Sequence, residues 1–322
     1  MEKKILGMGN AVLDILTSAS DDYLKNNKLS KGSMYLVEQK KSDDLLKKIK
    51  PIKKDSGGSV ANTIVGISIL GLPGFFCGKV KNDKLGKDFA RNIEETGVNF
   101  LCKRANAGMP TARCLVFVTP DGERTMQTFL GASTTLDERD ISENFFEEIK
   151  YLLIEGYLWS SESARRAIKK AITIAKKNGI EVIFSLSDQG LATMYKKDFL
   201  KLIKENIDIL IGNEQEYKGI FDTNNAKEIF AKIGNFLNIG VITSGNKGAT
   251  IFSENKVETV KATKIDKVID TTGAGDMFAA GFLYKLLNEV PAKQAGIFGC
   301  KTAGRIIRQY GARPDKETFK NI

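Results

Sequence analysis

The distribution of apolar and polar residues divides the chain into two parts, and the change lies near residue 151. Beyond that point, short apolar runs alternate with longer segments whose apolar residues recur at helical spacing, which indicates alternating strands and helices. The predicted strands cover 151–158, 181–187, 207–213 and 241–245, and the predicted helices cover 161–178, 194–206 and 226–236. Strands that recur every ~25 to 30 residues with helices between them indicate βαβ units and a parallel sheet covered on both faces.

The first third of the chain shows a second kind of strand. Residues 3–9 predict a core strand, but further apolar segments are separated by predicted helices at 59–70 and 84–96. These segments cover 11–20, 33–38, 111–119 and 124–130, and PDG at 120–122 predicts a hairpin turn between the last two. We therefore predict a single α/β domain over 1–322, with a small β-sheet lid formed by excursions at about 11–40 and 105–131.

Composition restricts the class of protein. The chain has 322 residues, 42% of them hydrophobic, which is enough for a large core, and its formal net charge is +10. A basic chain suits a nucleic-acid partner or an anionic substrate such as ATP. The lysines, however, are scattered in pairs such as Lys169–Lys170 and form no concentrated basic helix, so we predict no nucleic-acid partner. No run approaches ~20 apolar residues, so we predict no membrane partner either.

Cysteine and histidine usage excludes several kinds of site. The four cysteines form no CxxC pair, which argues against zinc and fits reduced thiols in a cytoplasmic protein. The chain contains no histidine, so a histidine base, a histidine metal ligand and every Ser–His triad are excluded. GMG at 7–9 lacks the third glycine of a dinucleotide fingerprint, and the Walker A loop and the protein-kinase motifs HRD and DFG do not occur.

The stretch DTTGAGDMFAAGF at 270–282 places two glycines and an aspartate between strand-like residues and a predicted helix at 277–288. The N–H groups at a helix start have no partners within the helix, and the helix dipole adds partial positive charge. This turn therefore predicts an anion-binding site. Asp276 has two interpretations at this point, as a general base or as a first-turn acid that only stabilises the helix.

Three other polar segments occur where predicted strands end or helices begin. GGSVAN at 57–62 opens a helix with a glycine pair, and TSGNKG at 243–248 forms a polar glycine loop suited to phosphates. In NEQE at 213–216, Asn213 and Glu216 share a helical face and can hold a hydrated Mg²⁺, although the same pattern is also a capping box. Because open α/β folds bind ligands at the carboxyl ends of their strands, these segments together predict one site.

The order of these segments resembles the ribokinase-like (PfkB) family of small-molecule kinases along nearly the whole chain, with GGSVAN and DTTGAGDMFAAGF as the specific signatures. The resemblance implies a ribokinase-like three-layer α/β/α domain with a mostly parallel central sheet and a small β-sheet lid. It also implies Mg²⁺-dependent transfer of the γ-phosphoryl group of ATP to an alcohol. In this interpretation Asp276 is the general base, and the anion hole consists of Gly273, Ala274 and Gly275.

Within this family, GMGNAVLDI at 7–15, SLSD at 185–188 and YGARPD at 310–315 are most similar to the adenosine kinases. The resemblance implies the 5′-hydroxyl of adenosine as the acceptor, and the alternative is a sugar such as ribose or fructose. The residues implied to bind the acceptor are Asp14, Gly58, Asn62, Leu36, Leu130, Ala132, Tyr157, Leu158 and Arg124. Those implied to bind ATP are Asn213, Thr243, Gly245, Gly248 and Thr271, and those implied to hold Mg²⁺ are Asn213 and Glu216.

Several alternatives stay open on the sequence alone. Trp159, the only tryptophan, fits either core packing or the wall around a nucleoside base. Arg124 fits either a solvated hairpin residue or a contact to the negative charge of the reaction. The chain fits a monomer or a homodimer. A non-catalytic ligand-sensing protein is a third class of function, and the intact GAGD and NEQE segments argue against it.

Overall fold

The computed structural model describes residues 3–322, and its core is a nine-stranded sheet with the order β14-β13-β12-β11-β10-β9-β1-β5-β6. The strands are β1 (Lys4–Met8), β5 (Gly74–Cys77), β6 (Asn99–Phe100), β9 (Ile149–Glu155), β10 (Glu181–Ser185), β11 (Ile209–Asn213), β12 (Ile239–Thr243), β13 (Ala249–Ser253) and β14 (Lys256–Val260). The pairs from β12 to β6 are parallel, whereas β12, β13 and β14 pair antiparallel. The predicted mostly parallel sheet is confirmed.

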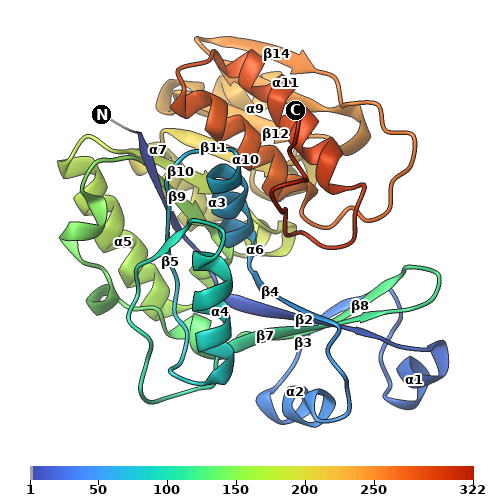
Figure 1. Ribbon diagram of the computed structural model, residues 1–322. Coiled ribbons are helices and arrows are strands. Elements are labelled where there is room, and N and C mark those ends of the chain that lie inside the picture. The colour runs from blue at the N-terminus through green and yellow to red at the C-terminus, as the bar shows by residue number, and fades with distance from the viewer. Residues whose placement is uncertain (1–2) are drawn as a thin grey trace.

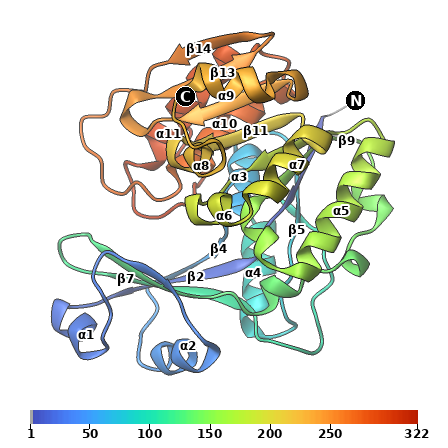
Figure 2. The same ribbon diagram turned by 180° about the vertical axis from the view of Figure 1, so that it is seen from behind.

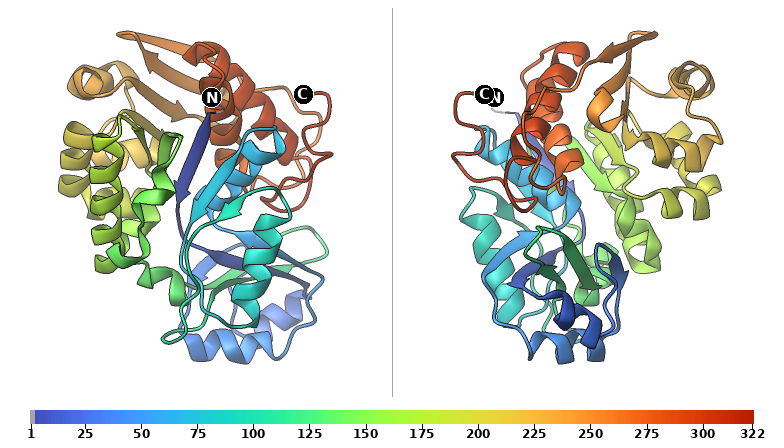
Figure 3. Two further views of the ribbon diagram at one scale, coloured as in Figure 1. Left: turned by 60° about the vertical axis from the view of Figure 1, so that its left-hand side comes forward. Right: turned by 90° about the vertical axis from the view of Figure 1, so that its right-hand side faces the viewer.

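Helices cover both faces of this sheet, which gives the three layers visible in Figure 3. On one face lie α3 (Ser59–Ile69), α4 (Lys84–Glu94), α10 (Ala274–Leu287) and α11 (Ala292–Ile306). On the other face lie α5 (Glu162–Lys177), α6 (Gln189–Met194), α7 (Lys196–Asn206), α8 (Glu214–Phe221) and α9 (Ala226–Ile233), most of which come forward in Figure 2.

The helix α5 illustrates how the sequence determines these elements. The side chain of Ser161 accepts a hydrogen bond from the Ala164 amide and so caps the first turn. Ala164, Ile168 and Ile172 follow at intervals of four residues and are buried against the sheet. The last turn carries lysines, whose positive charge suits the carboxyl end of the helix dipole.

A second sheet of five strands follows the carboxyl end of β1 and has the order β3-β8-β7-β2-β4. Its strands are β2 (Val12–Ser18), β3 (Met34–Leu36), β4 (Lys53–Gly57), β7 (Ala112–Val118) and β8 (Arg124–Phe129). Figure 1 shows it projecting from the larger part of the molecule, with α1 (Asp21–Asn26) and α2 (Gln39–Leu46) on its outer side. Leu13, Ile15 and Phe117 pack in one cluster with buried leucines of these two helices.

The structure departs from the predicted elements in places that bear on function. The predicted strand 151–158 ends at Glu155, because the chain then turns into a short 3₁₀ helix, η4 (Gly156–Ser160). The predicted helix 194–206 begins earlier and is divided into α6 and α7. β4 was not predicted, since its sequence KKDSG has no alternation of apolar and polar residues. Within residues 3–322, no helix is long and apolar enough to cross a membrane.

Candidate active site

A pocket of about 340 Å³ lies where β10, β11 and β12 end and α3 and α10 begin. In a parallel sheet these carboxyl ends meet at one edge, where open α/β folds bind their ligands. The small sheet contributes to the same pocket through β2. The predicted site residues that line it are Asp14, Gly58, Asn62, Tyr157, Asn213, Glu216, Thr243, Gly275 and Asp276.

The glycine turn before α10 has the backbone that an anion site requires. Gly273 caps the helix with φ +79°, and a Cβ there would lie 2.6 Å from the Cα of Ala312, so only glycine fits. Met277 makes a helical bond to the Gly273 oxygen at 2.8 Å, and the amides of Gly275 and Asp276 precede it. Apart from its neighbours in the chain and the backbone of α10 itself, no described residue comes within 4 Å of the position that a Cβ of Gly275 would occupy, so an anion has room to approach.

Two side chains of α3 bind the carboxylate of Asp276. Ser59 Oγ donates to Oδ1 at 2.6 Å, and Asn62 Nδ2 donates to Oδ2 at 2.8 Å. Burial raises the pKa of Asp276, while the hydrogen bonds from Ser59 and Asn62 and the charge of Arg313 lower it. The carboxylate is therefore fixed in orientation next to the anion-binding turn. Its role as a general base stays a prediction.

Two further oxygen acceptors belong to this pocket. Asn62 is buried, and its Oδ1 has no hydrogen-bond partner among residues 3–322. A buried acceptor without a partner costs about 1–3 kcal/mol, so Oδ1 is suited to a hydroxyl donor from a substrate. Asp14 lies in β2, and desolvation raises the pKa of its carboxyl to about 7, although the positive charge of Arg313 opposes the shift.

Arg313 was not predicted as a site residue, although it stands in the segment YGARPD. Its guanidinium is buried and donates to Ser56 Oγ at 3.0 Å and to the Ala61 carbonyl at 3.3 Å. Desolvation lowers the pKa of Arg313 to about 10, whereas the carboxylates of Asp55, Asp14 and Asp276 raise it. Arg313 therefore places a positive charge near the carboxylates of the pocket. Its hydrogen bond to the Ala61 carbonyl also joins the C-terminal segment to α3.

Asn213 and Glu216 form a complete capping box at the start of α8. Asn213 Oδ1 accepts from the Glu216 amide at 2.9 Å, and Glu216 Oε2 accepts from the Asn213 amide at 2.9 Å. Glu216 Oε1 also accepts from Asn213 Nδ2 at 2.7 Å. Desolvation raises the pKa of Glu216 to about 7. The hydrogen bonds give both residues a helix-capping role. Because both also line the pocket, a role in Mg²⁺ binding stays a prediction.

The residues predicted to bind ATP are only partly gathered at the pocket. Thr243 ends β12 and lines it. Gly245 and Gly248 flank the 3₁₀ turn η6 (Gly245–Lys247) just beyond, and both have positive φ values. Thr271 is exposed, and its carbonyl accepts a hydrogen bond from the Ala274 amide at 3.2 Å, while its neighbour Thr272 lines the pocket.

The residues predicted to surround a nucleoside base lie in different environments. Tyr157 lines the pocket, whereas Leu158 and Trp159 pack in the hydrophobic core, because η4 turns them away from the strand direction. Trp159 contacts Phe199 at 5.9 Å between ring centroids, so core packing is its structural role. The three remaining residues differ in exposure: Ala132 is buried, Leu130 is half-buried, and Leu36 is 64% exposed on the edge strand β3.

Arg124 lies on β8 and is not a solvated hairpin residue. Its Nη2 lies 2.9 Å from Oδ2 of Asp270, and both side chains are largely buried. Asp270 Oδ1 in turn accepts from the Thr272 amide at 3.0 Å. The ion pair therefore joins the small sheet to the loop that leads into the glycine turn.

The sequence also gave no role to Ser59, Glu155, Ser185 and Ser187, which lie in or beside the pocket. Gly58 occupies the cap position of α3, and Ser59, in the first turn, reaches Asp276. The partner of Ser59 is 217 positions away, so no local pattern could have indicated this contact.

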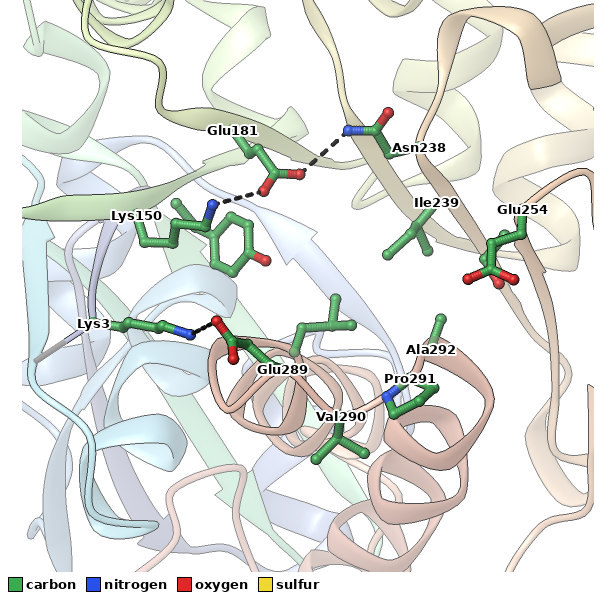
Figure 4. A pocket seen from close by; sticks show the side chains of 13 residues that line it. Lys3, Lys150, Glu181, Asn238, Ile239, Glu254, Glu289, Val290, Pro291 and Ala292 are labelled. Carbon is green, nitrogen blue, oxygen red and sulfur yellow. Dashed lines mark hydrogen bonds and ion pairs between the residues drawn. The ribbon is translucent and has the colours of Figure 1, made fainter.

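A second cavity, of about 330 Å³, lies at the opposite edge of the large sheet (Figure 4). Two ion pairs lie in it: Lys150 pairs with Glu181 at 3.3 Å, and Lys3 pairs with Glu289 at 2.5 Å, whereas Glu254, which also lines it, has no ion pair among residues 3–322. None of the predicted site residues lines it. We therefore take the pocket at the carboxyl ends of the strands as the candidate active site.

Comparisons with family models, curated proteins and solved structures all indicate small-molecule kinases. The family model of the pfkB family carbohydrate kinases matches residues 26–318. A curated relative, the 5-dehydro-2-deoxygluconokinase of Clostridium botulinum (strain Eklund 17B / Type B), is 28% identical over 86% of this chain and 85% of its own length.

Two solved structures are similar over almost their entire length. One is described as a probable sugar kinase protein from Rhizobium etli; it has a TM-score of 0.87 and 36% identity, over 97% of this chain and 95% of its own. The other is the adenosine kinase from Sinorhizobium meliloti, with a TM-score of 0.87 and 34% identity, over 98% of this chain and 96% of its own. Both sugar kinases and adenosine kinases are therefore among the proteins that this chain resembles.

Proposed function

The chain belongs to the pfkB family of carbohydrate kinases, and on that premise we propose that it transfers the γ-phosphoryl group of ATP to the 5′-hydroxyl of adenosine or a close purine nucleoside. The family establishes a phosphotransferase with an alcohol acceptor and ATP as co-substrate. The identity of the acceptor and the roles of individual residues are the proposal.

In the proposed reaction, Asp276 accepts the proton of the acceptor hydroxyl while the hydroxyl oxygen forms a bond to the γ-phosphorus. The bond from the γ-phosphorus to the β,γ-bridging oxygen breaks, and ADP leaves. Phosphoryl transfer depends mostly on positioning and on stabilising negative charge, so a well-oriented carboxylate is sufficient as the base. The amides of Gly275 and Asp276 lie beside that carboxylate and are suited to bind the transferring phosphoryl group. The observation that carries the proposal is this pairing of a fixed carboxylate with an open anion-binding turn in one pocket.

The acceptor is proposed to carry a cis-diol next to its reactive hydroxymethyl group. Asp14 can accept hydrogen bonds from two hydroxyls, and the unpaired Oδ1 of Asn62 can accept another. A ribose ring offers hydroxyl donors of this kind. Asn62 would then contact both the ribose and Asp276, which would place the 5′-hydroxyl at the base.

An apolar surface beside Asp14 supports a nucleoside rather than a free sugar. The pairing of β2 with β7 puts Cys114 opposite Asp14 and Val116 opposite Leu16, on the face that also carries Val12. Val12, Cys114 and Val116 form a small apolar cluster, against which Leu16 also packs. A flat base can pack on such a surface, which a sugar would not need.

We propose that Asn213 and Glu216 hold Mg²⁺ through water molecules. The two residues already form hydrogen bonds with each other in the capping box. Only the remaining lone pairs of their side-chain oxygens are therefore available to the water molecules of hydrated Mg²⁺. The ion would supply charge neutralisation for the phosphates of ATP. Glu216 lies in the same pocket as Asp276, so the assignment is consistent with one reaction centre.

A sugar kinase is the second candidate, and two observations favour it. Ser185 and Ser187 line the pocket together with Tyr157 and make it polar where a nucleoside base would need an apolar surface, although Ser187 Oγ already accepts from the Gly156 amide and donates to the Ser185 carbonyl. The curated relative from Clostridium botulinum is named for a sugar-acid derivative rather than a nucleoside.

A competition experiment separates the two candidates. Adenosine, inosine, ribose, fructose and 5-dehydro-2-deoxygluconate are offered singly and together with ATP and Mg²⁺, and products are identified by mass. We expect adenosine to have the highest kcat/KM and to yield AMP. A far higher kcat/KM for one of the sugars would replace the nucleoside proposal with the sugar-kinase alternative.

A further inference from the structure

Glu155, at the end of β9, is a buried carboxylate that the proposed reaction does not use. Its side chain is 1% exposed, and it forms no ion pair with a lysine or arginine of residues 3–322. Instead it accepts three N–H hydrogen bonds: Oε2 from the Val60 amide at 3.0 Å, and Oε1 from Asn10 Nδ2 at 3.1 Å and from the Asn10 amide at 3.4 Å. Burial raises the pKa of Glu155 to about 7, while the donors at Val60 and Asn10 lower it.

One donor residue, Asn10, belongs to a short connection between the sheets, and the other, Val60, lies in the first turn of α3 just after a second short connection. Residues 9–11 link β1 of the large sheet to β2 of the small sheet, and Gly58 alone links β4 of the small sheet to α3. Gly58 has φ +105°, and a Cβ there would lie 2.1 Å from the carbonyl oxygen of Asn10. The two connections are therefore in backbone contact. Glu155 binds the first connection at Asn10. It also binds the Val60 amide in the first turn of α3, which follows the second connection.

Each connection leads directly to a residue of the candidate site. Asp14 follows the first connection within β2. Ser59 and Asn62 follow the second connection in the first turn of α3, and both bind Asp276. A displacement of either connection would change the distance between the diol-binding groups and the base.

We propose that Glu155 is a positioning residue that fastens both connections to the large sheet and thereby sets Asp14 and Asn62 at the correct distance from Asp276. This inference rests on the proposed function for the roles of those three residues. The carboxylate is suited to the task because an ionised acceptor binds several N–H donors more strongly than a neutral one. Loss of this clamp should affect acceptor binding more than ATP binding, since Thr243 ends β12 and Gly245 begins η6, and the hydrogen bonds of Glu155 go to neither element.

The test compares Glu155→Gln with Glu181→Gln. The Gln side chain has the same size but turns an NH₂ group toward one of the N–H donors, so at least one hydrogen bond is lost. Glu181 is the control, because it lies at the start of the parallel strand β10 and also accepts a hydrogen bond, but in the remote cavity of Figure 4.

Hydrogen exchange followed by mass spectrometry is the first measurement, and it needs no substrate. In Glu155→Gln we expect amides in 8–13 and 57–63 to exchange about tenfold faster, with the rest of the protein unchanged. Steady-state kinetics is the second measurement: KM for adenosine should rise about tenfold while KM for ATP stays within about twofold. Glu181→Gln should leave both measurements unchanged.

Asn10→Ala provides a second route if Glu155→Gln fails to fold. It removes only the side-chain donor, so KM for adenosine should rise less, and combining it with Glu155→Gln should add little. Wild-type exchange in both segments, or an equal rise in both KM values, would overturn the positioning role. If the wild type does not phosphorylate adenosine at all, the nucleoside proposal fails, and the exchange measurement still decides whether Glu155 fastens the connections.

Discussion

At the scale of single residues, Asp276 owes its orientation to side chains of α3 that lie far away in the sequence. Ser59 is 217 positions distant and Asn62 is 214, yet each binds one carboxylate oxygen. The hydrogen bond from Ser59 lowers the pKa of Asp276 and so counteracts the effect of burial. The activity of the proposed base should therefore depend on Ser59 in a way that a pH profile reveals.

We predict that Ser59→Ala shifts the acid limb of the pH profile of kcat/KM to higher pH. Removal of the donor raises the pKa of Asp276, and the base acts only when it is ionised, so more alkaline conditions are needed. A shift of roughly one pH unit corresponds to the loss of one hydrogen bond to a charged group. The measurement is kcat/KM for the acceptor between pH 5 and pH 9.

Thr63→Val is the control for this prediction. Thr63 Oγ1 donates to the backbone carbonyl of Asp276 at 3.2 Å and does not touch its carboxylate. Its removal should therefore leave the acid limb in place. An unmoved acid limb in Ser59→Ala would show that Ser59 does not tune the base.

Single residues also show which features of the site can be predicted from the sequence and which cannot. Asp276 was identifiable because a glycine turn at a helix start is a local pattern. The contact from Ser59 was not, because it depends on how α3 and α10 pack together. Leu158 was expected at the base, but the chain leaves the strand direction after Glu155, and a change of one residue in backbone geometry reverses the side that a residue faces.

At the scale of elements, long amphipathic segments were predicted well and short or polar ones were not. The helices expected at 161–178 and 84–96 appear as α5 and α4, within one or two residues at each end. Their burial follows one face of the helix, so periodicity locates them. β4 was missed because KKDSG has no alternation of apolar and polar residues, and β13 was missed because it pairs antiparallel with β12, outside the strand–helix alternation that located the other strands.

The capping box at α8 yields a prediction that separates its structural role from a role in Mg²⁺ binding. Glutamine can keep the bond to the Asn213 amide that closes the capping box and loses only the bond from Asn213 Nδ2, so Glu216→Gln should lower the free energy of unfolding by no more than about 1 kcal/mol. The loss of negative charge should nevertheless raise the Mg²⁺ concentration needed for half-maximal activity about tenfold. Both quantities are measured on the same preparation, by denaturant unfolding and by Mg²⁺ titration of turnover.

Glu228→Gln is a matched control within the same chain. Asn225 caps α9 and its Oδ1 accepts from the Glu228 amide, while Asn225 Nδ2 donates to Glu228 Oε1 at 3.0 Å. This exposed pair repeats the Asn-x-x-Glu pattern away from the pocket. The same Mg²⁺ titration for both variants and the wild type would mean that Asn213 and Glu216 serve only as a helix cap.

At the scale of the whole molecule, carboxylates gather where the two sheets meet. Asp14, Glu155 and Glu216 are held there, and burial raises the pKa of each to about 7. The ion pair of Arg124 with Asp270 joins the small sheet to the loop that precedes α10. This arrangement serves the proposed reaction, and it costs stability whenever the buried carboxylates are ionised.

We predict that the free energy of unfolding is larger near pH 5 than at pH 8. Between the ordinary carboxyl pKa values of about 4 and the raised values of about 7, the folded state binds more protons than the unfolded state. Stability must therefore fall as the pH rises through this window. Asp137 works in the opposite direction, because its hydrogen bond with Arg139 lowers its pKa to about 2, but its contribution is lost only below about pH 4.

Urea unfolding at constant ionic strength between pH 5 and pH 8 checks this expectation. In Glu216→Gln one of the titrating groups is absent, so the dependence on pH should be shallower than in the wild type. A free energy of unfolding that increases from pH 5 to pH 8 would contradict the assigned direction of the shifts.

The central claim is that Asp276 is the base of a kinase whose site lies at the carboxyl ends of the strands. The most direct test is the rate of AMP formation from adenosine and ATP by Asp276→Asn, with binding of both substrates followed separately by calorimetry. The account predicts that both substrates still bind, because Asn keeps the size of the side chain, while turnover falls by roughly 10²-fold or more. Turnover close to that of the wild type, with intact binding, would contradict it.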